Sequence, residues 1–131
     1  MTISIHDDVL DKGPNEIKTN ATTVTICAGA PTTLSDATTN LGTGTGKKLA
    51  DVTVDSSDWS IADGSPDGRT LTFTQQTGVT VDVSGDADHL AVVDASRLLL
   101  VIPLSATVAV TSGNTMTINS FTYRIPDPVA A

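Results

Sequence analysis

Short runs of alternating apolar and polar residues recur along this chain, and turn residues separate them. Residues 69–74 place Leu71 and Phe73 between threonines, and residues 79–83 repeat the pattern with three valines. Alternation with a period of two puts the apolar side chains on one face of a β-strand and the polar ones on the other. The pattern therefore predicts half-buried strands that cover a core on one side only.

Composition agrees with a β-rich chain. Among 131 residues there are 22 threonines, and aspartate outnumbers glutamate by 14 to 1. Threonine favours strands, whereas aspartate favours turns and caps over helix interiors. The length suits one domain. We therefore predict an all-β fold: a single-domain β-sandwich or jelly-roll-like barrel of about eight short strands with little helix.

The strands are expected at residues 22–28, 48–54, 59–61, 69–74, 79–83, 88–93, 98–104, 107–111, 115–119 and 121–125. Three turn segments predict hairpins that join neighbouring strands: residues 75–78, 94–97 and 112–114. Residues 98–102 are apolar at every position, which predicts a strand covered on both faces. Such a strand would be central, with a subunit contact on its second side, or it would cross the core. Pro103 marks its end or a sheet edge.

Two segments lack a strand pattern within the single β domain of residues 1–131. Residues 1–20 are expected to form an irregular N-terminal arm, with a helical turn from Ser4, its N-cap, to Asp11. Gly13-Pro14 should end that turn. Residues 32–48 are expected to form a long Thr/Gly-rich loop.

The net charge of −8 is concentrated in one stretch. Residues 51–94 hold nine aspartates against Arg69. Phosphate backbones and anionic membrane surfaces attract clustered Lys and Arg. The concentration of negative charge in residues 51–94 therefore argues against nucleic-acid and membrane partners. It predicts either a self-repelling surface or an acidic face that docks on a basic partner.

Two loops resemble ligand-binding motifs but depart from them. Residues 42–48 contain Gly-Lys, but a P-loop requires glycine where Leu41 stands and Ser or Thr where Lys48 stands. Residues 63–68 resemble half of a calcium loop, but Thr74 occupies the position of the bidentate carboxylate. A flexible loop tip and a β-turn are the better interpretations, and no cofactor or metal is predicted.

Catalysis is not predicted either. Cys27 is the only cysteine and lies in an apolar run, which is typical of a buried thiol. His6 and His89 are the only histidines and are far apart in sequence. Aspartates are abundant, but paired carboxylates of glycosidases normally lie in aromatic clefts, and aromatic residues make up only 3% of this chain. The chain is interpreted as a protein that is not an enzyme.

The first residues lack the basic start and apolar region of a secretory signal, and no run is long enough for a transmembrane helix. We therefore expect synthesis and folding in the cytoplasm.

Several segments resemble a family of small structural proteins from the virions of tailed phages and prophages. The resemblance is carried by residues 26–39 (ICAGAPTTLSDATT), 87–94 (ADHLAVVD), 98–99 (LL), 111–118 (TSGNTMTI) and 125–128 (IPDP). Members of that family tend to begin with an Ala/Leu-rich amphipathic helix, where this chain has Gly-Pro.

The resemblance implies a virion protein, most plausibly a capsid decoration (cement) protein that binds the outside of the head. The partner would be the major capsid protein, and a trimer at local three-fold positions is the favoured assembly. Two alternatives remain: a tail or head–tail connector component, and a bacterial adhesion or carbohydrate-binding β-domain. The second would require export and an aromatic binding face.

The candidate contact residues are taken from the glycine loop, the acidic stretch and the apolar strand. They are Gly42, Gly44, Gly46, Lys47, Lys48, Asp55, Asp58, Asp63, Asp67 and Leu100.

Overall fold

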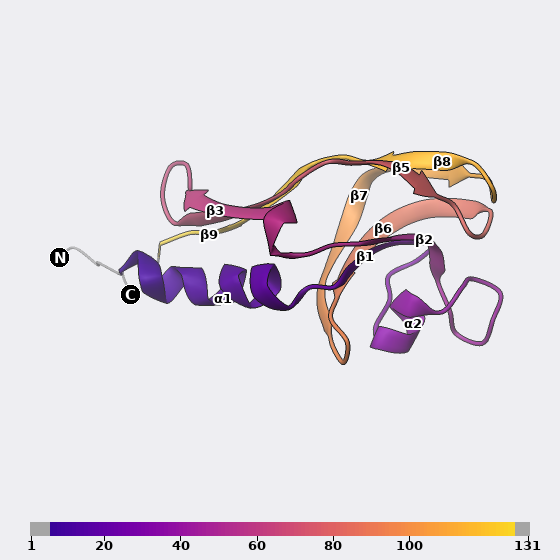
Figure 1. Cartoon of the computed structure of the whole chain (residues 1–131), viewed down its shortest axis with the longest axis horizontal. Helices are drawn as coiled ribbons and strands as arrows, with labels where there is room; N and C mark the ends of the chain where they lie inside the picture. The colour runs from indigo at the N-terminus through magenta and orange to yellow at the C-terminus, as the bar shows by residue number, and fades with distance from the viewer. Residues whose placement is uncertain (1–5, 128–131) are drawn as a thin grey trace.

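The computed structural model describes residues 6–127 and contains nine strands and two α-helices in that part of the chain (Figure 1). The strands are β1 (Thr23–Cys27), β2 (Lys48–Thr53), β3 (Trp59–Asp63), β4 (Arg69–Phe73), β5 (Gln76–Thr80), β6 (Gly85–Val93), β7 (Leu98–Val110), β8 (Thr115–Ile118) and β9 (Phe121–Ile125). The helices are α1 (Asp7–Asn20) and α2 (Leu34–Thr38), and Ser56–Asp58 form a 3-10 turn. All strand pairs between these elements are antiparallel, so the predicted all-β, sandwich-like class is confirmed.

The strands lie in one curled arrangement. The first sheet has the order β2-β1-β6-β7, and the remaining strands form a three-stranded sheet, β3-β4-β9, and a two-stranded sheet, β5-β8. Phe73 pairs with Phe121, and Gln76 pairs with Ile118 three residues further along each strand. The register of β4–β9 therefore continues as far as Gln76, and the two smaller sheets form a continuous ribbon. A shift in register follows between Gln76 and Val79. A bridge between Ala50 and Val81 joins β2 to β5 and brings this ribbon against the first sheet.

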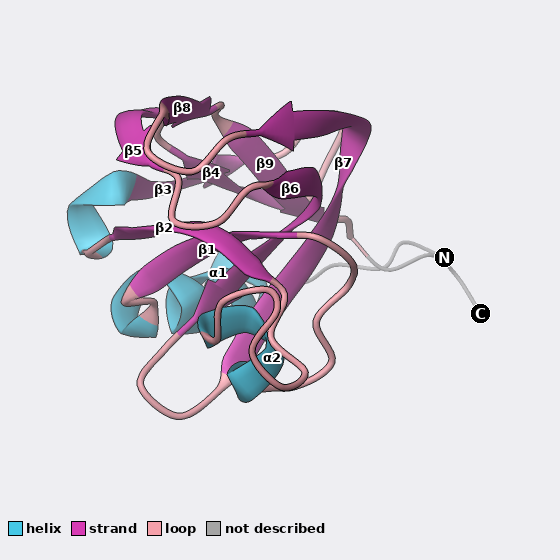
Figure 2. Ribbon diagram, turned by 90° about the vertical axis from the view of Figure 1, so that its right-hand side faces the viewer, coloured by secondary structure: helices cyan, strands magenta, loops and turns pink. Residues whose placement is uncertain are grey.

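The main core lies inside this curl. A smaller cluster lies on the other face of the first sheet, on the side where Figure 2 shows α2. Trp59, Phe73 and Phe121 pack together in the main core, with ring centroids 4.7 to 6.0 Å apart. On the outer face of the first sheet, α2 packs on β1, β2 and β6. Its Ala37 is fully buried against Ala91 of β6.

The prediction that Gly13-Pro14 would end the N-terminal helix is wrong, because α1 continues through both residues. Leu10, Pro14 and Ile17 are buried on one face, where α1 packs on β3 and β4. Pro14 removes the single bond that its N–H would have donated to the carbonyl of Leu10. Burial of the Pro14 ring and of the other apolar side chains on this face offsets the free-energy cost of that missing hydrogen bond.

Polar contacts also tie α1 to the sheet, so the segment is not an irregular arm. Asp11 accepts a hydrogen bond of 2.7 Å from Arg69 Nε of β4, and Lys18 Nζ donates to the Trp59 carbonyl at 2.7 Å. Ser4, which was predicted to cap the helix, lies outside the described residues.

The predicted loop at residues 32–48 contains α2 and is held together by one carboxylate. Asp36, buried in the loop, accepts hydrogen bonds from Thr45 Oγ1 at 2.7 Å and from Thr32 Oγ1 at 3.0 Å. These bonds, led by that from Thr45, lower the pKa of Asp36 from 3.8 to about 2. The segment therefore has an internal hydrogen-bonded structure of its own.

Two of the three predicted hairpins are wrong. Only the turn at residues 94–97 joins paired strands, β6 and β7. Residues 76–78 lie within β5, which pairs with β8 rather than with β4. After β7, the turn at 112–114 carries the chain across to the other sheet. There Gly113 N donates to the carbonyl of Val81.

Candidate interaction surface

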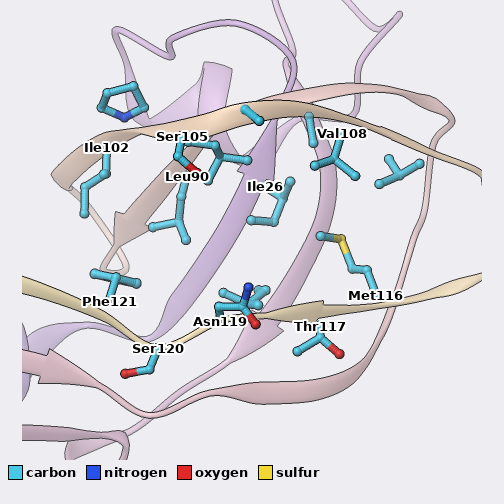
Figure 3. A pocket seen from close by; sticks show the side chains of 16 residues that line it. Ile26, Leu90, Ile102, Ser105, Val108, Met116, Thr117, Asn119, Ser120 and Phe121 are labelled. Atoms are coloured by element: carbon cyan, nitrogen blue, oxygen red, sulfur yellow. The ribbon is translucent and has the colours of Figure 1, made fainter.

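The curl leaves an opening between β7 on one side and β8 and β9 on the other. We call this opening, lined by residues 102–110 and 116–121 over a floor from β1 and β6, the seam. It holds a cavity of about 470 Å³ (Figure 3). Ile26, Ala87 and Leu90 form its floor. The seam is therefore a place where the inside of the sandwich meets the surface.

Both walls of the seam are mainly apolar. Ile102 and Val108 come from β7, and Met116 and Phe121 come from the opposite strands. Val108 is 50% exposed, which is unusual for a valine beside a core. Apolar cavities of about 300 to 1,000 Å³ with a few polar groups at the rim are typical binding sites.

A bulge in β7 shapes the mouth of the seam. Pro103 pairs with His89 and Val108 with Ala87, so four residues of β7 lie opposite Asp88 alone. Residues 104–107 therefore leave the ladder. Proline has no N–H to donate and is found in sheets mainly on edge strands and at bulges. The strand order confirms the predicted edge, because β7 is the last strand of its sheet.

The position of β7 corrects the prediction that residues 98–102 form a central strand. These residues are half-buried, and the strands of this sheet that are paired on both sides are β1 and β6. Leu100 packs against the main core from this edge position. The run is apolar on both faces because each face packs on a different cluster. Its inner face packs on the main core, and Leu98 and Val101 pack on the smaller cluster beside α2.

The seam also coincides with the longest uncharged stretch of the sequence. Residues 98–123 contain no Asp, Glu, Lys, Arg or His, although the chain carries a net charge of −8. This stretch forms β7, β8 and the start of β9. Edge strands commonly carry charges that discourage pairing with other chains, and this one carries none. The charge-free run was visible in the sequence, and it is the signal that sequence reasoning missed.

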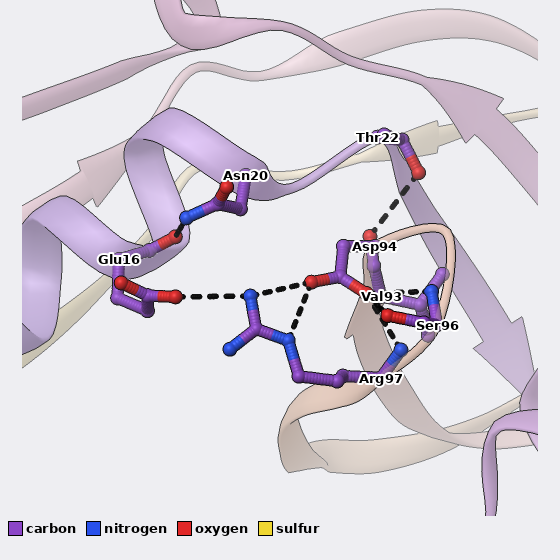
Figure 4. Close-up of polar contacts among 7 residues, drawn as sticks. All are labelled: Glu16, Asn20, Thr22, Val93, Asp94, Ser96 and Arg97. Carbon is purple, nitrogen blue, oxygen red and sulfur yellow. Dashed lines mark hydrogen bonds and ion pairs between the residues drawn. The ribbon is translucent and has the colours of Figure 1, made fainter.

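Asp94 fixes the turn from which β7 begins (Figure 4). Its carboxylate accepts hydrogen bonds from the backbone N–H groups of Ser96 at 2.8 Å and Arg97 at 2.6 Å, and from Arg97 Nε at 2.7 Å. The bond from Ser96 is the main cause of the lowered pKa of Asp94. Arg97 also forms an ion pair of 2.9 Å with Glu16 of α1. The edge strand is thus anchored to the helix.

The glycine loop does not form one exposed surface as predicted. Gly42 and Gly44 are exposed and have positive φ, whereas Gly46 is buried against the carbonyls of residues 39 and 40. Lys47 and Lys48 are half-buried. Lys48 forms ion pairs of 3.5 and 3.6 Å with aspartates 51 and 82.

The four predicted acidic contact residues all have internal partners. Asp55 and Asp58 form a capping box around the 3-10 turn. Asp63 lies 2.6 Å from Arg69, and Asp67 lies 2.7 Å from Arg124. They lie at a 3-10 turn and at the β3–β4 turn, away from the glycine loop at the other end of the molecule (Figure 1). The structure therefore does not bring the predicted surface together.

A cysteine and a histidine that are far apart in sequence lie opposite each other on β1 and β6. Cys27 is in register with His89, whose Nδ1 lies 2.8 Å from Asp88 Oδ1. Cys27 is fully buried, and its burial raises the pKa of the thiol. A protonated, buried thiol is a poor nucleophile. This arrangement is therefore a packed part of the sheet.

No group of three or more His, Cys, Asp or Glu side chains within residues 6–127 is placed to hold a metal. No helix of that segment is long and apolar enough to span a membrane. Comparison with protein-family models, with curated proteins and with solved structures found no match for the chain.

Proposed function

We propose that this chain is a non-enzymatic structural protein of a phage virion, a capsid decoration protein that binds the outside of the head and stabilises the shell. The observation that carries the proposal is the seam, an exposed apolar surface without charges on an otherwise charged β domain. An uncharged edge strand beside an apolar cavity is suited to contact with another protein chain. The virion assignment is supported by the resemblance of residues 26–39, and of segments 87–94, 98–99, 111–118 and 125–128, to phage structural proteins.

The physical properties of the chain suit this role. Its partner would be the major capsid protein, and three copies would meet at local three-fold positions of the shell. A modest contact repeated over an icosahedral surface gives strong overall attachment, because neighbouring contacts raise the effective concentration of each copy. The net charge of −8 disfavours nucleic acid as a partner. The location would be the outer capsid surface, after synthesis in the host cytoplasm.

Immunogold electron microscopy tests the proposal. Antiserum against the purified chain is applied to phage particles from a culture that expresses it, with pre-immune serum as the control. Gold over the heads is the expected result. Gold confined to the tail or neck would replace the decoration role with a tail or connector role. Particles without gold in a culture that makes the chain would overturn the virion assignment.

A further inference from the structure

We infer that the seam is the surface through which copies of this chain bind one another. This inference rests on the proposed structural role, and it identifies the protein surface that covers the seam. The occupant is a second copy, which packs over the exposed rim of β7 and the apolar cavity beside it.

Charge is the first reason for a second copy as the occupant. Each copy carries a net charge of −8, so most orientations bring like charges together. The seam is built from residues 102–110 and 116–121, which include no charged side chain. Two copies that meet there bury no charged side chain of the seam itself. The seam is thus suited to self-association.

Exposure is the second reason. Val108 would be shielded from water by a partner, and so would the half-buried side chains of Ile102, Leu104 and Met116. The rim beside them carries small uncharged groups, among them Ser105 and Ala106. A rim of small residues allows close approach of a second backbone, while the cavity accepts the larger side chains. Burial of apolar area provides the driving force.

The bulge in β7 limits how the copies can pair. An unbroken exposed edge would allow strands to add without end. In β7, Pro103 and residues 104–107 interrupt the ladder, so continuous strand pairing cannot extend along this edge. Side-chain packing over the seam then favours a closed assembly of few copies rather than a fibre.

The test measures the mass of the purified full chain in solution over a range of concentrations, by light scattering and sedimentation. The chain has a mass of 13.4 kDa, so a trimer would be three times that. The variants are Val108→Lys and Ser105→Lys, both at exposed seam positions. Val9→Lys is the matched control, because Val9 is 61% exposed on α1, and α1 packs on β3, β4 and the 3-10 turn. Circular dichroism confirms that each variant is folded.

We expect the wild type and Val9→Lys to associate equally. Each seam variant should weaken association by on the order of 100-fold, because a lysine at the contact buries an unpaired charge. A wild type that stays monomeric up to high concentration would overturn the inference. So would folded seam variants that associate like the wild type.

The two proposals can fail separately. A dimer that both seam variants disrupt would support the seam contact and contradict the trimer in the proposed function. Gold on phage heads together with a monomeric chain would support decoration and reject self-association through the seam.

Discussion

At the scale of single residues, aspartates hold the irregular parts of this protein in place. Asp94 organises the β6–β7 turn, Asp36 organises the segment before β2, and Asp55 caps the 3-10 turn. Aspartate is short enough to accept hydrogen bonds from backbone N–H groups two or three residues away. The abundance of aspartate thus reflects local structure more than an acidic binding face.

Removal of the Asp94 carboxylate should loosen the start of the edge strand. We expect Asp94→Ala to lower the Tm by roughly 5 °C or more, because the N–H groups of Ser96 and Arg97 lose their acceptor. Asp86→Ala, at an exposed position on β6, is the control and should leave the Tm close to wild type. Thermal unfolding followed by circular dichroism measures both. Equal Tm values for the two variants would contradict this role of Asp94.

Stability should fall in acid, and Asp36 should account for part of the loss. Its folded pKa of about 2 lies below the ordinary value of 3.8. The group therefore stabilises the fold fully above pH 3.8, and this contribution is lost as pH falls toward 2. Chemical unfolding at several pH values should show this loss. In Asp36→Asn the decline over that range should be shallower, and a decline equal to wild type would contradict the assignment.

At the scale of elements, α1 belongs to the core of the domain. Ile17 is 7% exposed in the main core cluster, whereas Val9 lies on the outer side of the same helix. We expect Ile17→Ala to lower the free energy of unfolding by about 2 to 4 kcal/mol. Val9→Ala should change it by less than about 0.5 kcal/mol. Urea titration of both variants measures this, and a small effect of Ile17→Ala would indicate an independent arm.

Most strands could be predicted from sequence, but several of their partners could not. The strand expected at residues 79–83 is β5 at Gln76–Thr80, and those expected at 98–104 and 107–111 are the single strand β7. Alternation identifies a strand such as residues 69–73 locally, since it reflects only the two faces of that strand. Pairing depends on contacts far along the chain, so a turn such as residues 75–78 gave a false hairpin. The N-terminal helix was predicted only as a turn that ends at Asp11, because Gly13-Pro14 is a strong local signal for a helix end. In the fold, burial of α1 against β9 and β4 offsets the cost of these two residues.

The candidate site was only partly predictable. Leu100 was identified from the apolar run and does lie on the edge strand beside the seam. The glycines and aspartates were predicted as contact residues because of their flexibility and charge. Glycine and aspartate are also common in local turns, so these properties did not identify a contact surface. The seam requires knowledge of which strands end a sheet, and this follows from the whole topology.

At the scale of the whole molecule, the net charge of −8 should govern how self-association responds to salt. Copies that meet at an uncharged seam still repel one another over the rest of their surfaces. Salt screens this repulsion, so we expect tighter association at about 0.5 M than at about 0.05 M NaCl. Sedimentation at both concentrations measures it. Weaker association at high salt would instead indicate that ion pairs carry the contact.

The continuous ribbon formed by β4–β5 and β8–β9 restricts how the length of this chain can change during evolution. Both pairs share one register across the break at residues 74–75 and 119–120. One residue inserted into either break alone would displace one half of the ribbon against the other and turn its side chains to the opposite face. Insertions there should therefore persist as matched pairs or be absorbed by a bulge like the one between Gln76 and Val79. The exposed loop at Gly42 and Gly44 can change length by itself.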